Sequence, residues 1–139
     1  MRQHQQTLTI ETRGQGLSEF TLDVVQIVGN SEIEVGLVHI FCRHTSASLL
    51  IQENADSDVQ RDLIAFFKRL VPDGDPLFVH RAEGPDDMPA HVKSALTQST
   101  LTIPIANGRL MLGTWQGIYL FEHRARSHTR EVIVHVIGD

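Results

Sequence analysis

The sequence predicts an α+β fold, with mainly antiparallel strands and two or three helices, in a single domain over residues 1–139. Short apolar runs bounded by glycine, asparagine or proline recur along the chain, which is typical of strands joined by turns. Residues 56–70 instead repeat their apolar side chains at helical spacing, so at least one amphipathic helix accompanies the strands.

The N-terminal part of the chain predicts one strand and one helix. Residues 6–12 alternate Leu8 and Ile10 with polar residues, which is the pattern of a half-buried strand. Residues 20–28 carry apolar side chains at short helical spacing, and we expect Gly29-Asn30 to end that helix.

The middle of the chain predicts two strands and the longest helix. Residues 35–42 are almost continuously apolar, so we expect a central strand that is covered on both faces. After a polar patch, residues 49–51 resume as a strand. The helix over 56–70 has one apolar stripe, and Asp56 or Ser57 can cap its start.

The C-terminal part predicts three strands. Residues 101–105 form the first, and Asn107-Gly108 is a strong hairpin turn that leads into a long strand over 110–122. Residues 129–137 form the last strand, whose inward positions are expected to be valines. These valines are Val132, Val134 and Val136.

Residues 80–91 are the densest group of polar side chains that can carry out chemistry. They contain two histidines and three carboxylates in twelve positions. Gly84-Pro85 breaks the segment, so the chain can reverse and bring His80 and Glu83 to face His91. The alternative is an acidic surface loop followed by a helix with a hydrogen-bonded core histidine.

A helix is predicted to start at the end of this segment. Pro89 suits its first turn, and Asp86 or Asp87 can cap it. The helix dipole disfavours a charged imidazole at His91 and so favours the neutral form, which binds metal or accepts a proton. The inward face is expected to carry Met88, His91, Val92 and Ala95.

Composition excludes several classes of protein. A net charge of −5 without any basic run argues against a general binder of nucleic acid or of anionic membranes. The first residues lack the apolar core of a signal peptide, and no segment approaches a membrane span. The single cysteine, Cys42, fits a cytoplasmic protein and is expected to be a buried small hydrophobe rather than a nucleophile.

The remaining histidines differ in their expected roles. His4 and His135 are expected at the surface, and His39 is expected to be a hydrogen-bonded core residue. His128 lies in a loop and stays undecided. His44 opens a hydroxyl-rich patch at a strand end, where its ring can face a cavity.

Further polar residues follow the predicted strands. Thr45 and Ser46 can orient a bound anion beside His44, and Glu53-Asn54 lies where strand pairing should stop. Glu122 shares a face with apolar residues, so it is either paired or functional. Three arginines can hold a phosphate or balance the carboxylates. They are Arg109, Arg124 and Arg130.

Common signatures of catalysis and of metal binding are missing. The chain has no nucleophile elbow, no glycine-rich nucleotide loop, no H-E-x-x-H and no paired C-x-x-C. Any metal site must therefore be assembled from distant segments.

Five motifs resemble those of the YjbQ family, in the family's order and over essentially the whole chain. They are His44-Thr45-Ser46-Ala47-Ser48-Leu49, Glu53-Asn54-Ala55-Asp56, His80-x-x-Glu83-Gly84, Asp86-Asp87-Met88-Pro89-Ala90-His91 and Gly113-Thr114-Trp115-Gln116. The resemblance implies a compact fold with a β-sandwich core, assembled as a homotrimer. It also implies weak secondary thiamine-phosphate synthase activity, which joins a pyrimidine diphosphate to a thiazole phosphate. The site residues that it implies are His44, Glu53, Asn54, His80, Glu83, His91, Trp115, Gln116 and Glu122.

Two functions follow as hypotheses. The first is a transferase that acts on phosphorylated small molecules, with a divalent metal, most simply zinc, at a site that keeps one position open. The second is a non-catalytic homotrimer that binds a metal or small anion. A metal-free acid-base and anion site competes with the metal assignment.

The residues expected to serve the first function fall into three groups. The catalytic candidates are Glu83, as general base or as partner of a histidine, and His44, Glu53, Asn54 and Glu122. The candidates for substrate binding are Thr45, Ser46, Trp115, Gln116, Arg124 and Arg130. The expected metal ligands are His44, His80 and His91.

Overall fold

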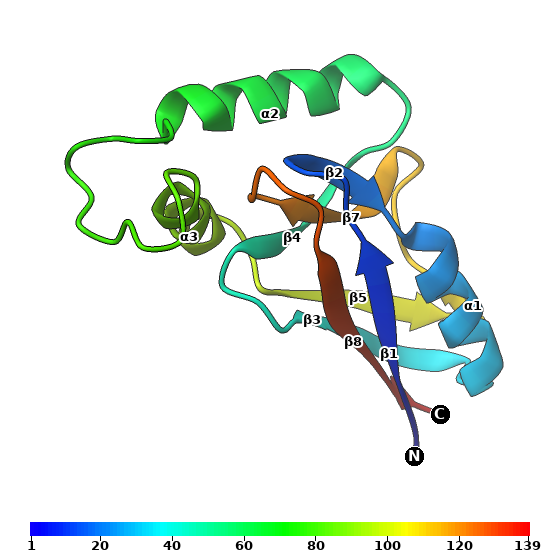
Figure 1. The fold of residues 1–139 in the computed structure, drawn as a ribbon. Helices are drawn as coiled ribbons and strands as arrows, with labels where there is room; N and C mark the ends of the chain where they lie inside the picture. Colours follow the sequence, from blue (N-terminus) through cyan, green and yellow to red (C-terminus); the bar gives the residue numbers. More distant parts are fainter.

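A computed structural model describes residues 1–139, with eight antiparallel strands in two sheets and three helices around them (Figure 1). The strand order is β1-β8-β3-β5-β6 in the larger sheet, which is curled, and β2-β7-β4 in the smaller one. The strands are β1 (Arg2–Glu11), β2 (Gly16–Glu19), β3 (Val35–Cys42), β4 (Ala47–Glu53), β5 (Thr100–Ala106), β6 (Arg109–Leu110), β7 (Gln116–Glu122) and β8 (Thr129–Gly138). The helices are α1 (Thr21–Ser31), α2 (Ser57–Leu70) and α3 (Asp87–Leu96). The predicted α+β class with a mainly antiparallel β-sandwich is confirmed.

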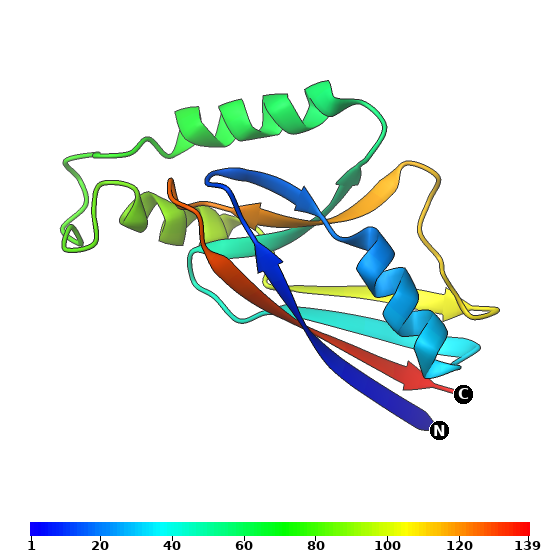
Figure 2. The same cartoon turned by 45° about the vertical axis from the view of Figure 1, so that its right-hand side comes forward.

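The core lies between the facing sides of the two sheets, and α1 closes one end of it (Figure 2). Ile40 of β3 and Val134 of β8 are fully buried against the smaller sheet, where Leu49 and Leu120 are equally buried. The prediction that the valines of β8 point inward is confirmed. Cys42 is also buried and free, as predicted.

The outer face of the larger sheet is not covered within the chain. Val35, Leu37 and Phe41 alternate along β3 on this face and are 64%, 38% and 48% exposed. The prediction that β3 is covered on both faces is therefore wrong for the single chain. His39 lies on the same face, with its Nδ1 3.0 Å from the hydroxyl of Thr102, and is not a core residue as predicted.

The N-terminal elements are longer than the sequence indicates. β1 begins at Arg2 because β8 pairs along its whole length, and the polar start of β1 hid this pairing. The short strand β2 was not predicted. α1 does not end at Gly29-Asn30 but continues to Ser31, and Glu32 ends it in the left-handed conformation.

α2 lies across the outer face of the smaller sheet (Figure 1). Asp56 caps it, as predicted, by accepting a hydrogen bond from the Asp58 N–H at 2.9 Å. The ring of Phe67 packs edge-on against Phe121 of β7, with 5.3 Å between ring centroids. None of the three helices is long and apolar enough to cross a membrane.

The predicted long strand over 110–122 is two strands. The turn at Asn107-Gly108 is confirmed, with φ of 52° and 69° at the two residues. The chain then leaves the larger sheet after β6 and enters the smaller sheet at Gln116. The intervening loop is held by a hydrogen bond from the Gly113 N–H to Gln116 Oε1, at 2.7 Å.

Candidate functional site

Four potential ligands from the segment 80–91 meet at Asp87. One ligand atom each of His80, Glu83, Asp87 and His91 lies within 4.8 Å of the others. The Nε2 atoms of His80 and His91 are 2.7 and 3.1 Å from Asp87 Oδ2, and His80 Nε2 is 3.7 Å from Glu83 Oε2. The chain thus reverses as the glycine-proline break indicated, and His80 and Glu83 face His91.

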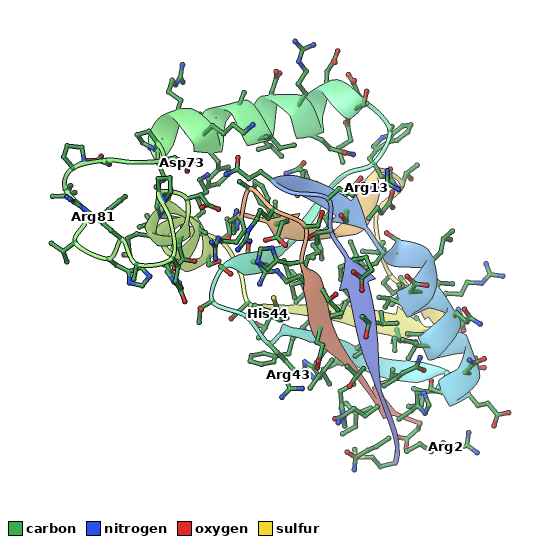
Figure 3. The ribbon with its side chains drawn as sticks, in the orientation of Figure 1. Arg2, Arg13, Arg43, His44, Asp73 and Arg81 are labelled. Atoms are coloured by element: carbon green, nitrogen blue, oxygen red, sulfur yellow. The ribbon has the colours of Figure 1, made fainter.

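Local geometry explains how these side chains come together. Asp87 and His91 are four residues apart on α3, so they share one face of the helix. Gly84 adopts a φ of 103°, which favours glycine, and its N–H donates to the Arg81 carbonyl at 3.2 Å to close the turn. Figure 3 shows Arg81 at the outer edge of this loop.

Arg124 holds the loop and the start of α3 in place. Its Nη1 is 2.8 Å from Asp87 Oδ1, its Nε donates to Asp86 Oδ2 at 3.0 Å, and its Nη2 donates to the Glu83 carbonyl at 2.9 Å. Asp86 also accepts from the Ala125 N–H at 2.9 Å, so it does not cap α3 with its side chain as predicted. Arg124 therefore orients the ligands, and its guanidinium is not free to bind a substrate.

The inward face of α3 differs from the predicted apolar stripe. Its buried residues are Asp87, Pro89, Ala90 and Lys93, whereas Ala95 is exposed. Burial alone raises the pKa of Asp87, but hydrogen bonds with His80 and Glu83 and the positive charge of Arg124 outweigh it, and this pKa falls to about 2. Asp87 is therefore an ionised, buried carboxylate near neutral pH.

The hydrogen bonding of His91 determines where its lone pair lies. Its Nδ1 is 2.9 Å from the Thr45 carbonyl, and because a carbonyl only accepts, Nδ1 must carry the proton. In the neutral imidazole the lone pair is then on Nε2, directly facing the ionised Asp87 Oδ2. Two electron-rich atoms at 3.1 Å require a proton or a metal cation between them.

The residues present fit a divalent metal. With ligand bonds of 2.0–2.1 Å, tetrahedral zinc separates neighbouring ligand atoms by about 3.3 Å. Three of the six distances between ligand atoms, 2.7, 3.1 and 3.7 Å, lie around that value, and all four ligand atoms are within 4.8 Å of one another. Two imidazoles and two carboxylates are a donor set that zinc accepts, and Arg124 supplies the outer-shell contact that orients a ligating carboxylate. His80 and Glu83 are partly open to solvent, so a substrate can reach the group.

His44 is not brought to these ligand atoms. Its Nε2 accepts the Glu131 N–H at 2.8 Å, so the proton of the neutral ring is on Nδ1. Nδ1 lies 3.5 Å from Arg130 Nη1. Burial, followed by the charge of Arg130, lowers the pKa of His44 and keeps it neutral. Figure 3 shows His44 just beyond the end of β3.

Glu122 and Arg130 form a buried ion pair at the end of β7. Of the two roles that the sequence left open for Glu122, paired or functional, the structure shows the paired one. Oε1 of Glu122 accepts from Thr12 Oγ1 at 2.7 Å and from Arg130 Nε at 2.8 Å, and Oε2 accepts from Arg130 Nη2 and the Arg124 N–H. Burial raises the pKa of Glu122, but these donors lower it overall. Arg130 also donates to Ser46 Oγ at 3.0 Å, so only its Nη1 faces His44.

The other predicted site residues lie at the far end of the smaller sheet. The register pairs Ala47 with Glu122 at one end of β4 and Glu53 with Gln116 at the other. These ends are six residue steps apart along β4, or about 20 Å. Glu53, Asn54, Trp115 and Gln116 therefore do not meet the Asp87 group within one chain. Trp115 is 62% exposed there.

Three residues of this region were not singled out as site residues by the sequence. In the sequence, Asp87 counts among the carboxylates of residues 80–91 and as a possible cap, but not among the predicted ligands, although its spacing of four from His91 on a helix is a readable sign of shared ligation. His123 is fully buried, with Nε2 2.9 Å from the hydroxyl of Ser48. Lys93 is buried on α3. No spacing in the sequence marks the last two.

The sequence is similar to one protein family over nearly the whole chain. The family model described as "UPF0047 protein YjbQ-like" matches residues 6–139. UPF0047 protein sll1880 of Synechocystis sp. is 56% identical over 138 residues, covering 99% of this chain and 94% of its own length. UPF0047 protein YjbQ of Escherichia coli O157:H7 is 39% identical, covering 98% of this chain and 99% of its own.

Solved structures agree with the fold. An uncharacterized conserved protein of the YjbQ/UPF0047 family from Clostridium acetobutylicum superposes with a TM-score of 0.86 at 35% identity. A conserved hypothetical protein from Thermus thermophilus gives 0.84 at 34%. Each comparison covers 94% of this chain and 98% of the other.

Proposed function

The chain belongs to the UPF0047 family of YjbQ-like proteins, and we propose that it is a transferase acting on phosphorylated small molecules at the Asp87 group. The reaction is of the thiamine-phosphate synthase type, in which a pyrimidine diphosphate and a thiazole phosphate are joined. The Asp87 group (His80, Glu83, Asp87 and His91) holds a divalent metal ion, most simply zinc.

One observation supports this proposal above the others. Two imidazole Nε2 atoms converge on Asp87 Oδ2, and the proton of His91 is held on its other nitrogen by the Thr45 carbonyl. His80 can donate a proton from Nε2 to Asp87, but the Nε2 lone pair of a neutral His91 faces the same oxygen, which is unfavourable unless a proton or a metal cation lies between them. Arg124 also holds the Asp87 carboxylate in place through Oδ1, the oxygen that does not face the imidazoles.

The chemistry follows from which groups are fixed and which are accessible. A bound divalent ion supplies charge neutralisation for a leaving diphosphate. The thiazole nitrogen attacks the pyrimidine methylene carbon with its lone pair as the bond to the diphosphate breaks, so the nucleophile loses no proton. Glu83 is the most exposed carboxylate of the group and lies beside His80, so it orients that imidazole, which can donate a proton to the leaving diphosphate. Asp87 stays ionised and orients both imidazoles.

A second set of contacts accounts for recognition of an anionic substrate. His44 Nδ1 and Arg130 Nη1 both carry protons, yet they face each other across 3.5 Å with no acceptor between them. Two convergent N–H donors are suited to one oxygen of a phosphate. Thr45 joins this pair to the Asp87 group, because it follows His44 and its carbonyl binds His91.

A cavity next to the Asp87 group has the size needed for the remainder of a substrate. Its volume is about 370 Å³, within the range of small-molecule sites. His80 forms part of its wall, together with Phe78 and Met88, so an apolar ring can pack beside the ligands.

The uncovered outer face of the larger sheet supports the homotrimer that the family resemblance implies. Leu37 and Phe41 of β3 lie there beside Ile133 and Ile137 of β8, which are their strand partners. Because Leu37 and Phe41 stay exposed and Ile133 and Ile137 only half-buried in one chain, a second copy of the chain is the occupant that we propose for this face. Light scattering of the purified protein is expected to give a trimer, and Phe41→Glu is expected to give monomers. A monomeric mass for the unaltered protein at micromolar concentration contradicts this assembly.

The transferase is tested by product formation from the pyrimidine diphosphate and the thiazole phosphate, with added zinc or with chelator. We expect zinc-dependent product, a loss of about 100-fold or more in Glu83→Gln, and rescue of a thiamine-requiring strain by the unaltered gene. Arg69→Gln, which changes an exposed charge on α2, serves as the control. No product and no rescue at high expression would favour the alternative, a non-catalytic trimer that binds metal or anion.

A further inference from the structure

α3 buries a second charged side chain on a different face from Asp87. Lys93 follows Asp87 by six positions, and only 3% of it is exposed. Its backbone carbonyl accepts from the Thr97 hydroxyl at 2.8 Å, as an ordinary part of the helix end. The side chain has no part in the Asp87 group and none in the proposed transfer.

The ammonium of Lys93 lacks a partner. Its Nζ donates no hydrogen bond to another residue, and none of the ion pairs of the chain, all with N···O distances up to 4.0 Å, includes it. Burial lowers the pKa of Lys93, the negative charges of Asp73 and Asp86 raise it, and the positive charge of Lys68 lowers it. Lys93 Nζ is not among the side-chain atoms that are sealed from solvent without a partner, so its charge reaches the cavity, where a counter-ion can supply the missing acceptor.

The side chain of Lys93 borders a cavity of about 280 Å³. The cavity lies between the end of α2, the loop that follows it, the turn before β2 and α3. Its charged lining consists of Lys68, Lys93 and Asp73, that is, two positive groups against one negative. Figure 3 shows Asp73 where this loop passes α3. Gln15, Val71 and Pro72 complete the wall.

The carboxylate of the protein interior behind this cavity, Glu122, is paired with Arg130. His123 is fully buried, its carbonyl accepts from Gln15 Nε2 at 3.3 Å, and its Nε2 lies against the Ser48 hydroxyl. Burial and the charge of Lys93 lower the pKa of His123 to about 3, so the ring is neutral at physiological pH. The positive charge of Lys93 is therefore balanced only in part, by Asp73 in the cavity wall and by Asp86, whose carboxylate already pairs with Arg124.

We propose that this cavity binds a small oxyanion of the phosphate class, held by the ammonium groups of Lys93 and Lys68. Charge-assisted hydrogen bonds to a phosphate satisfy the donors that the protein leaves without acceptors. The volume exceeds that of one phosphate, so both free phosphate and a small phosphate monoester fit. The site is separate from the Asp87 group, and the two proposals stand or fall independently.

The test is isothermal titration of the full chain with inorganic phosphate and, separately, with glycerol 2-phosphate, in the presence of chelator. Lys93→Met is expected to weaken phosphate binding about tenfold or more, and Lys68→Gln by a smaller factor. The matched control Arg69→Gln removes one exposed positive charge of α2 outside this cavity and is expected to leave the affinity unchanged. Binding of both ligands indicates a phosphate-class site, and binding of inorganic phosphate alone restricts it to the free ion.

Two further measurements keep the proposal falsifiable. Lys93→Met is expected to melt no lower than the unaltered protein in phosphate-free buffer, because it removes an unpartnered buried charge. His44→Ala, which removes one of the two donors assigned to the substrate phosphate, is expected to keep the phosphate binding that Lys93→Met weakens, and this separates the two sites. No binding to the unaltered protein at millimolar phosphate, or equal affinity in Lys93→Met and Lys68→Gln variants and the unaltered protein, would overturn the proposal.

Discussion

Glu122 at the end of β7 and Asp87 at the start of α3 are carboxylates buried to a similar degree, at 1% and 2% exposure. Every donor within hydrogen-bonding distance of Glu122 keeps its proton at physiological pH, namely the Thr12 hydroxyl, the Arg130 guanidinium and the Arg124 N–H. Asp87 has one such fixed partner, Arg124, on Oδ1, and two imidazoles on Oδ2.

The difference separates a structural ion pair from a site capable of chemistry. A carboxylate surrounded by permanent donors has nothing to exchange, so Glu122 and Arg130 fix the end of the smaller sheet. Imidazoles can give up a proton for a metal ion near neutral pH, so the Oδ2 side of Asp87 can change its occupant. The degree of burial alone does not distinguish the two; the chemistry of the partners does.

The largest effect is expected at the structural pair. In Glu122→Gln the side-chain amide N–H groups meet the donors of Arg130 and Thr12, and the buried guanidinium loses its counter-charge. We expect the free energy of unfolding to fall by about 3–5 kcal/mol, measured by urea denaturation. Zinc affinity of the folded fraction should remain. A loss below about 1 kcal/mol would show that the pair is not a structural element.

Asp87→Asn is expected to lower the free energy of unfolding less than Glu122→Gln does, but to cause a large loss of zinc affinity. The amide cannot neutralise a divalent ion, so zinc affinity is expected to fall by at least about 100-fold, or 2.7 kcal/mol. Arg124 keeps its contacts with Asp86 and Glu83, so the loop stays in place. Competition with a fluorescent zinc indicator measures the change, and unchanged affinity would remove Asp87 from the ligand set.

The pH dependence sharpens the comparison further. The pKa of Asp87 in the folded state, about 2, is below its ordinary value of 3.8, so the unfolded state binds the proton more tightly. Its contribution to the free energy of unfolding is about 2 kcal/mol, present above about pH 4 and lost as the pH falls through 2. Urea denaturation of the unaltered protein and of Asp87→Asn, with chelator, is expected to converge over this range. Parallel curves would contradict the assignment.

The smallest effect is expected at the far end of the smaller sheet. Trp115 is largely exposed and contacts neither carboxylate group. Trp115→Ala should change the free energy of unfolding by no more than about 0.5 kcal/mol and leave zinc affinity unchanged. A large loss of zinc affinity in this variant would mean that Trp115 and the Asp87 group act as one site, across a subunit boundary.

Features encoded locally were predictable from the sequence. The valines of β8, the capped helix α2 and the turn at Asn107-Gly108 follow from periodicity and turn chemistry, and all three are confirmed. The reversal that brings His80 to His91 follows in the same way from a glycine-proline break followed by a helix start.

Features that depend on distant partners were not predictable. The single run over 110–122 hides a transfer between sheets, because both halves are apolar and only pairing with β5 or β4 separates them. Asp86 has the position of a helix cap in the sequence, but its carboxylate accepts a hydrogen bond from Arg124, which lies 38 residues later. His44 was expected among the metal ligands, but the Glu131 N–H, which occupies its Nε2, lies 87 residues away.

The most direct test of the Asp87 group is the metal content of the protein after dialysis against limiting zinc, measured by atomic emission. We predict one zinc ion per chain in the unaltered protein and in His44→Ala, and none in His80→Ala or His91→Ala, with all variants folded by circular dichroism. Zinc that persists in both His80→Ala and His91→Ala, or that disappears in His44→Ala, would contradict this account.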